Sequence, residues 1–148
     1  MFKKCIIACA FLAPCAHAAS NISKQLMCNM TAAEFFTPLT RFGLIDFNAI
    51  KNEDSISYFR ILKMPPGAIR PEVVMAFGMN VKAVFGYVED QMLFRRGPGT
   101  QPPNTFGVVV DGSAELAKQK LDSVGAYKTK VRSLSNTTTE IFCEDIYK

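Results

Sequence analysis

Histidine and tryptophan are almost absent from the sequence. It contains no tryptophan and one histidine, His17, which lies in a segment that has the features of a removable leader. Without histidine, the rest of the chain cannot form a Ser-His-Asp or Cys-His catalytic centre, or a zinc site with histidine ligands. We therefore expect neither a histidine-dependent enzyme nor a metal or other cofactor.

The sequence also lacks a hydrophobic run that could span a membrane. The apolar run at residues 5–13 is far shorter than the roughly 20 residues that cross a bilayer. It follows Lys3 and Lys4 and precedes Ala16-His17-Ala18, a small-x-small pattern typical of signal-peptide cleavage. We predict a secretory signal peptide over residues 1–18 and a soluble product with no transmembrane segment.

The leader indicates where the product goes. Its short, lysine-led form is typical of bacteria, so we expect residues 19–148 to form a single domain in the periplasm or outside the cell. An alternative is Leu12-Ala13-Pro14-Cys15, which resembles a lipoprotein cleavage site and would leave a lipidated Cys15. Proline directly before the cysteine fits that pattern badly, so we place the lipoprotein second.

Cysteine becomes scarce once the leader is removed. Of five cysteines, only Cys28 and Cys143 follow residue 18, and they form no Cys-x-x-Cys motif. Two cysteines in an oxidising compartment are most simply explained as a disulfide. We predict this bond, and a bridge over so long a loop contributes about 4 to 5 kcal/mol in the loop-entropy model.

Positive and negative charges are nearly balanced. The formal net charge is +4, and two of the positive charges are the leader lysines, which leaves +2 for the rest of the chain. A balance this mild gives no reason to expect nucleic acid as a partner. A hydrophobic content of 49% is typical of a globular domain.

The first helix is predicted from its end signals. Thr31 and Glu34 have the capping-box spacing, and the helix should run to about Arg41, with Gly43 as its left-handed stop. Pro38 counts against an unbroken helix. The side chains expected in the core are Phe35, Phe36, Leu39 and Phe42.

A second helix is predicted to begin at Ser113, its N-cap, and to end at Gly125. Glu115 lies in its first turn, near the positive end of the helix dipole. The side chains expected in the core recur at helical spacing and are Ala114, Ala117, Leu121 and Val124.

Alternation of apolar and other residues predicts the strands. The clearest is residues 81–88, which we expect to return as a hairpin through residues 92–95 after a reversal at residues 89–91. Residues 44–54 hold no single period and carry turn residues, so no strand is predicted there. The other predicted strands are residues 55–62, 73–75, 105–110, 127–134 and 138–144.

Together these elements predict an α+β domain. We expect an antiparallel sheet of about five or six strands, with two helices packed mainly on one face and one disulfide. The second face of the strand at residues 81–88 is also largely apolar, so either the chain or a partner must cover it.

The most distinctive loop is residues 95–104, which is rich in proline and glycine. Prolines and tight turns make such a loop semi-rigid, and a preorganised loop loses less entropy on binding. Its paired arginines can form bidentate contacts with carboxylate or phosphate groups, although such pairs at strand ends commonly face solvent. The candidate binding residues of this loop are Arg95, Arg96, Pro98, Gln101 and Asn104.

A second candidate binding site is a basic stripe. Lys128, Lys130 and Arg132 alternate with other residues in the predicted strand at 127–134, so they should line one side of it. Such a stripe could steer an acidic partner. The alternative is a solvated face that discourages pairing between sheet edges.

Three classes of function fit these features. We place first a small secreted, periplasmic interaction domain that binds another protein, as inhibitors and toxin-immunity proteins do without catalytic residues. The alternative is a periplasmic carrier of a small apolar or anionic ligand or a lipid. A carboxylate-based enzyme comes last, because adjacent acidic residues on a strand point to opposite faces.

Overall fold

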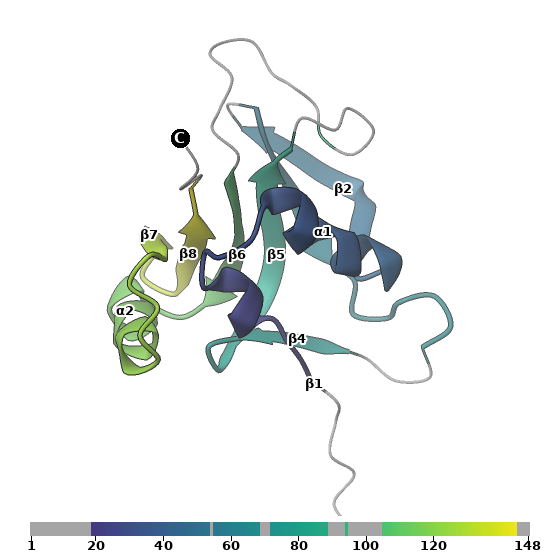
Figure 1. The fold of residues 1–148 in the computed structure, drawn as a ribbon. Coiled ribbons are helices and arrows are strands. Elements are labelled where there is room, and N and C mark those ends of the chain that lie inside the picture. The colour runs from purple at the N-terminus through teal and green to yellow at the C-terminus, as the bar shows by residue number, and fades with distance from the viewer. Residues whose placement is uncertain (1–18, 54, 69–71, 89–93, 95–104, 145–148) are drawn as a thin grey trace, which may run out of the picture.

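The computed structural model describes residues 19–53, 55–68, 72–88, 94 and 105–144, and the predicted leader lies outside them. These residues form an α+β fold with one mixed sheet and two α-helices (Figure 1). No helix in this part of the chain is long and apolar enough to cross a membrane. The elements are β1 (Ala19–Asn21), a 3-10 helix η1 (Ser23–Leu26), α1 (Ala32–Arg41), β2 (Ile45–Glu53), β3 (Ile56–Ile61), β4 (Val73–Ala76), β5 (Met79–Tyr87), β6 (Thr105–Asp111), α2 (Ala114–Ser123), β7 (Lys130–Ser135) and β8 (Thr138–Cys143).

The sheet is larger than predicted and is not purely antiparallel. Its eight described strands follow the order β1-β4-β5-β6-β8-β7, with β3 paired to β5 and β2 paired to β3. All of these pairs are antiparallel except β1 with β4, which is parallel. The prediction of five or six antiparallel strands is therefore wrong in strand number and in sheet type, although the α+β class is confirmed.

The sequence did not predict two of the strands, the three-residue β1 and the longer β2. β2 has a physical reason for its weak signal. It pairs with β3 through Asp46 and Arg60 at one end and through Lys51 and Tyr58 at the other, with a register shift between the two. A register shift interrupts the alternation of side chains along a strand. The sequence of β2 therefore carries no clean period of two.

The central hairpin also differs from the prediction. β5 pairs with β3 along one edge and with β6 along the other. β6 therefore lies beside β5 where the sequence predicts a return strand at residues 92–95. Of that predicted return strand only Phe94 lies within the described residues, and its ring packs 4.8 Å from that of Phe36 (centroid to centroid). The strand predicted at residues 127–134 begins later, at Lys130, because the backbone N–H of Thr129 closes a turn onto the carbonyl of Ala126.

Helix α1 has the predicted ends. The Thr31 hydroxyl accepts a hydrogen bond from the backbone N–H of Glu34, and the Glu34 carboxylate accepts one from the N–H of Thr31 at 2.7 Å. Gly43 has a left-handed φ of 64° after the last turn. Phe42, predicted to lie in the core, is instead 66% exposed, because it is the C-cap residue where the chain leaves the helix axis.

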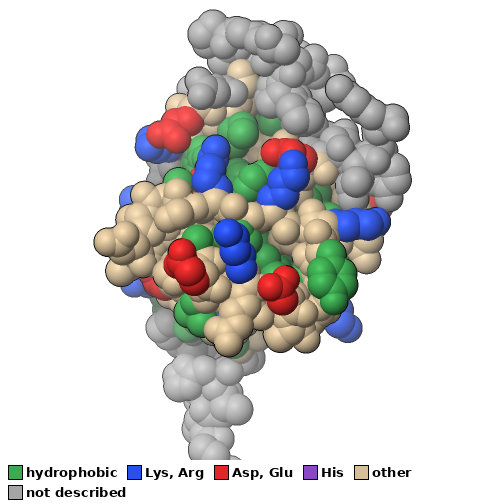
Figure 2. Space-filling model, turned by 90° about the vertical axis from the view of Figure 1, so that its left-hand side faces the viewer, with side chains coloured by type: hydrophobic (Ala, Val, Ile, Leu, Met, Phe, Trp, Pro, Cys, Tyr) green, Lys and Arg blue, Asp and Glu red, His purple; other side chains and the backbone are tan. Residues whose placement is uncertain are grey.

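Helix α2 also has its predicted end signals and an exposed C-cap residue. Ser113 caps its first turn and Gly125 has a φ of 71° after it, as predicted. Ala117 and Leu121 are buried, whereas the C-cap residue Val124 is exposed, contrary to the prediction. Figure 2 views the side of the molecule on which α2 and β7 lie and shows basic and acidic side chains interspersed there.

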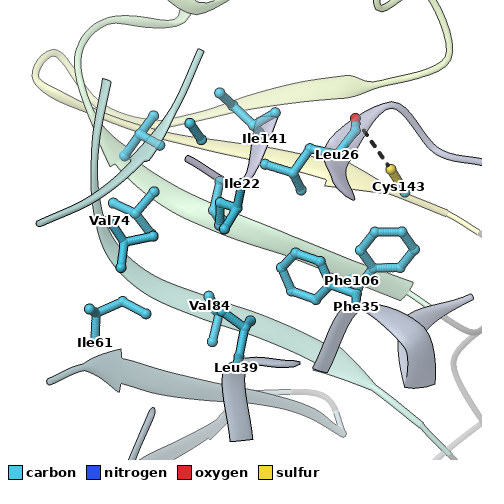
Figure 3. Packing of buried hydrophobic residues seen from close by; sticks show 14 of the residues in the cluster. Ile22, Leu26, Phe35, Leu39, Ile61, Val74, Val84, Phe106, Ile141 and Cys143 are labelled. Atoms are coloured by element: carbon cyan, nitrogen blue, oxygen red, sulfur yellow. Dashed lines mark hydrogen bonds between the residues drawn. The ribbon is translucent and has the colours of Figure 1, made fainter. Parts of the chain in front are cut away.

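Both helices cover one face of the sheet, which we call the first face. In Figure 1, α1 and η1 lie in front of the sheet, and Figure 3 shows side chains of these helices against strand side chains. Phe35 of α1 stacks on Phe106 of β6 with ring centroids 4.9 Å apart. The sheet residues in this core include Phe59, Val84, Phe106, Val108, Val110 and Ile141, and the helix residues include Phe35, Phe36, Leu39, Ala117 and Leu121.

The predicted disulfide is confirmed. Cys28 and Cys143 are bonded across a sequence separation of 115 residues, and their Cα atoms lie 5.3 Å apart. Nearby, the carbonyl of Leu26 accepts a hydrogen bond of 2.6 Å from the hydroxyl of Thr129. The start of α1 is thus tied to the end of β8 and to the segment that leads into β7.

Candidate functional site

The predicted binding loop lies outside the described residues, including Arg95, Arg96, Pro98, Gln101 and Asn104. The residues that hold its two ends are described. Phe94 packs against Phe36 and Phe59, and Thr105 begins β6 opposite Tyr87 of β5. The loop is therefore rooted at the end of the sheet where β5 ends and β6 begins.

At the same end of the sheet, an aromatic row crosses the opposite face, which we call the second face. The strand register aligns Tyr58 of β3, Phe85 of β5, Gly107 of β6 and Phe142 of β8. Lys51 and Lys130 pair with the two outer residues of this line. The helix side chains of the hydrophobic core lie on the first face, so no described helix covers this row.

The aromatic row closes over a glycine. Tyr58 stacks on Phe85 with ring centroids 5.0 Å apart, and the Phe85 centroid lies 6.2 Å from that of Phe142. A Cβ atom on Gly107 would lie 2.5 Å from the Cβ of Phe142 and 2.8 Å from Cζ of Phe85. Glycine at this position therefore lets the two phenylalanine rings meet above β6.

A buried carboxylate beside the aromatic row binds both Tyr58 and Arg132. Glu140 of β8 is completely buried. Its Oε1 accepts a hydrogen bond of 3.0 Å from the hydroxyl of Tyr58, and its Oε2 accepts one of 2.6 Å from Nε of Arg132. The guanidinium carbon of Arg132 also lies 5.9 Å from the ring centroid of Phe142. We call Tyr58, Glu140 and Arg132 the Glu140 clamp.

The three groups of the Glu140 clamp have complementary charges and protonation states. Burial of the Tyr58 phenol and, next, the negative charge of Glu140 raise the pKa of Tyr58 well above its usual range, while Arg132 acts in the opposite direction. The hydrogen bond to Glu140 raises the pKa of Arg132. Tyr58 is therefore a neutral donor and Arg132 a fixed cation at neutral pH, which suits a rigid surface better than acid-base chemistry.

The basic stripe is largely neutralised by this arrangement. Arg132 pairs with Glu140, and Lys130 forms an ion pair with Glu144. Lys128 lies in the turn before β7 and is exposed, so it does not share a strand with the other two. The described stripe therefore offers a cation-aromatic surface and not a row of uncompensated positive charge.

Sequence reasoning missed the central residues of this site. Glu140 faces away from the core side chains Thr139 and Ile141, so alternation indicated a solvent-exposed carboxylate. The available signal was the short turn at residues 136–137, which places Arg132 directly opposite Glu140 across the β7–β8 pair. Tyr58 lies on β3, which is separated from β8 by β5 and β6. No sequence signal indicated that Tyr58 would reach the same carboxylate.

Comparison of the chain with family models, with curated proteins and with solved structures found no match. Among the described residues, no group of three or more His, Cys, Asp or Glu side chains could hold a metal ion. The geometry of the second face is therefore the main structural guide to function.

Proposed function

We propose that the protein is a small secreted, periplasmic interaction domain of the inhibitor or immunity type, which binds another protein through its second face. The proposed binding surface consists of the aromatic row and the exposed side of the Glu140 clamp, and the loop predicted from the sequence at residues 95–104 is proposed to add to it. The observation that carries the proposal is a partly exposed group of Tyr58, Phe142 and Arg132, held in fixed positions on a sheet face that no described helix covers.

The chemistry of this surface fits protein recognition. Tyrosine, phenylalanine and arginine are enriched in interfaces, and tyrosine and arginine dominate binding hot spots. Arg132 keeps 57% of its side-chain surface exposed although its Nε is bound to Glu140. Since the clamp already fixes these side chains, a partner would immobilise fewer free rotamers on binding.

The proposed compartment rests on two features. The predicted leader would deliver the chain across the inner membrane, and the Cys28–Cys143 disulfide is of the kind that persists in oxidising compartments. Cleavage after Ala18 would leave β1, which begins at Ala19, within the mature chain.

Affinity capture with matched variants tests the proposal. The tagged protein, expressed with its own leader, is incubated with native envelope extract and with extracts of competitor strains. Phe142→Ser and Lys130→Glu alter the proposed surface, whereas Lys118→Glu makes the same charge change as Lys130→Glu on α2, which packs on the first face of the sheet. We expect the two surface variants to reduce capture of the same stoichiometric partner at least tenfold, because a lost hot-spot contact costs more than about 1.4 kcal/mol.

The control variant should capture the partner as the unchanged protein does, and all variants should give the same circular dichroism spectrum. Equal capture by the Phe142→Ser, Lys130→Glu and Lys118→Glu proteins would contradict the placement of the binding surface on the second face.

The carrier of a small ligand is the second candidate function. One structural observation favours it, a pocket beside α1 of about 250 Å³. The pocket lies on the helix side of the sheet and not on the second face.

A further inference from the structure

Strand β7 forms an open edge of the sheet, next to the second face. It comes last in the order β1-β4-β5-β6-β8-β7, and β8 is the one described strand with which it pairs. In an antiparallel pair, every second residue of an edge strand directs its backbone N–H and C=O away from its neighbour. All residues of β7 are exposed except Val131, which is half-buried. Another chain can therefore reach these outward backbone groups.

The other two edges among the described strands suit pairing less well. β1 has three residues. β2 has a register shift between Asp46 and Lys51, which interrupts its edge. β7 keeps a regular register with β8 from Lys130 to Ser133, before a shift between Ser133 and Ser135. This regular stretch is within the length range of natural strands, so a short partner strand can pair along it.

The basic side chains of β7 point inward, away from this edge. Lys130 forms an ion pair with Glu144, which directly follows β8. Arg132 Nε donates a hydrogen bond of 2.6 Å to Glu140 of β8, and its guanidinium carbon lies 5.9 Å from the ring centroid of Phe142, also of β8. Basic side chains on an edge strand commonly discourage pairing. Because both charges are paired on the inner side of β7, the edge lacks that protection.

The charge of β7 selects the kind of chain that fits its edge. Residues 127–135 include Lys128, Lys130 and Arg132 and no acidic residue. The side chains of Lys130 and Arg132 keep 56% and 57% of their surface exposed, and each cationic group has more N–H donors than its ion pair uses. Opposite charges across a strand pair are favourable, and like charges are unfavourable. The edge therefore favours an acidic strand over a basic one.

We propose that the edge of β7 binds an extended, acidic segment of the protein partner, which adds a strand to the sheet. Backbone hydrogen bonds to β7 supply the affinity, because an extended backbone presents N–H and C=O groups at the same spacing as the edge. Carboxylates at alternate positions of the segment face Lys130 and Arg132 on the second face. This inference rests on the proposed function and states how the partner is held.

Three matched peptides of about eight residues test the inference. One alternates glutamate with valine, the second has lysine in place of glutamate, and the third is the glutamate peptide with its central amides N-methylated. Amide NMR titration and hydrogen exchange of the whole protein measure binding. We expect the glutamate peptide to shift β7 amide resonances and slow their exchange, the lysine peptide to bind about tenfold more weakly, and the N-methylated peptide not to bind.

Three results would overturn the proposal. The first is the absence of any shift in β7 resonances with the glutamate peptide at millimolar concentration. The second is equal binding by the N-methylated peptide, because that peptide cannot donate backbone hydrogen bonds to the edge. The third is a dimer in analytical ultracentrifugation whose β7 amides are protected without peptide, because a second copy of the chain would then occupy the edge.

A pair of charge variants tests the preference for acid. Lys130→Glu reverses a charge on β7 and should weaken binding of the glutamate peptide about fivefold. Lys118→Glu makes the same change on α2 and should leave binding unchanged. Equal affinities of the two variants for the glutamate peptide would overturn the acidic character assigned to the segment.

Phe142→Ser separates this inference from the proposed function. Phe142 lies on β8, one strand in from the edge, so the variant should bind the glutamate peptide as the unchanged protein does while it loses capture of the protein partner. Lost capture without any peptide binding to β7 in the unchanged protein would overturn edge pairing and leave the second face as the binding surface. Peptide binding to β7 with capture that Phe142→Ser leaves intact would contradict the second face and support the edge.

Discussion

The two faces of the sheet are buried in different ways. On the first face, two helices lie across the strands and cover an apolar core. On the second face, Phe85 and Val109 are as buried as core residues, yet the described cover consists of side chains from the strands themselves. Tyr58 lies over Phe85, and Arg132 lies beside Phe142.

Neighbouring residues of β8 show the contrast most directly. Ile141 and Glu140 point to opposite faces, and each is 0% exposed. The first is buried by nonpolar packing, which depends on matched shape. The second is buried by two hydrogen bonds, to Tyr58 and Arg132, which depend on matched charge. One strand can therefore place a fully apolar and a fully polar side chain in equally dry surroundings.

The largest effect on stability should come from loss of the Cys28–Cys143 disulfide, which ties the start of α1 on the first face to the end of β8. Replacing both cysteines, Cys28→Ser with Cys143→Ser, should reduce the free energy of unfolding by about 4 to 5 kcal/mol, since the bond constrains a very long loop in the unfolded chain. Chemical denaturation followed by circular dichroism measures it. A loss below about 1 kcal/mol would mean that the helices cover this face without help from the disulfide.

A methyl group can test how tightly each face is packed. Gly107→Ala on the second face should cost about 3 kcal/mol, because its Cβ would lie 2.5 Å from the carbonyl oxygen of Ile141 and would also clash with the Phe142 Cβ and the Phe85 ring. Gly86→Ala is the counterpart on the first face, with Cβ 2.5 Å from the carbonyl oxygen of Thr105 and 2.7 Å from the Phe36 ring. Equal losses in urea denaturation would mean that both faces are equally rigid, and a much smaller loss for Gly107→Ala would show that the aromatic row yields.

The polar clamp should behave differently from a surface ion pair. Arg132→Met leaves the buried Glu140 carboxylate without its cation and should cost about 2 kcal/mol, a value reduced by the solvent exposure of Arg132 itself. Arg132→Met combined with Glu140→Met should recover most of this loss. Lys130→Met, which breaks an exposed pair with Glu144, should cost less than about 0.5 kcal/mol in the same denaturation assay. Equal effects of Arg132→Met and Lys130→Met would contradict a stabilising clamp.

Alkaline pH should loosen the second face before it affects the first. The pKa of Tyr58 is raised in the folded protein, by burial first and by Glu140 next. The stability that this phenol contributes is therefore complete below the unfolded-state pKa of about 10 and is lost as pH rises through the higher folded-state value. Absorbance titration at 295 nm should contain a late component that Tyr58→Phe lacks. An unchanged titration in Tyr58→Phe would rule out this coupling.

The smallest effect on stability should come from the binding loop. Arg95→Ala with Arg96→Ala should change the free energy of unfolding by less than about 0.5 kcal/mol, while it weakens capture of the protein partner. Thermal denaturation and the capture assay together measure the two outcomes. Unaltered capture would remove the loop from the binding surface and leave the aromatic row as its remaining part.

The elements with local signals were predictable from the sequence. The capping box at Thr31 and Glu34 marked the start of α1, and two cysteines after the leader allowed one disulfide within the mature chain. Alternation located β5, and a continuous apolar run located β6. The sequence failed where a signal was interrupted, as in the shifted register of β2, or too short, as in the three residues of β1.

The candidate site was less predictable, because its residues meet through the strand order. β3 and β8 are separated in the sheet by β5 and β6, yet Tyr58 of β3 reaches Glu140 of β8. The stacking of Tyr58 on Phe85 holds the Tyr58 ring over β5, and Gly107 has no side chain that would displace the Phe85 ring above β6. Neither condition has a signature within a single segment of the chain.

The span of the disulfide has a consequence for biosynthesis. Cys143 follows Cys28 by 115 residues and lies in the last described strand. Because synthesis begins at the N-terminus, the thiol of Cys28 is made 115 residues before its partner. The intervening sequence holds no other cysteine, so no residue made during this delay competes with Cys143 for that thiol. The covalent closure cannot form before β8 has been made, and a chain cut short before β8 would leave Cys28 without its partner.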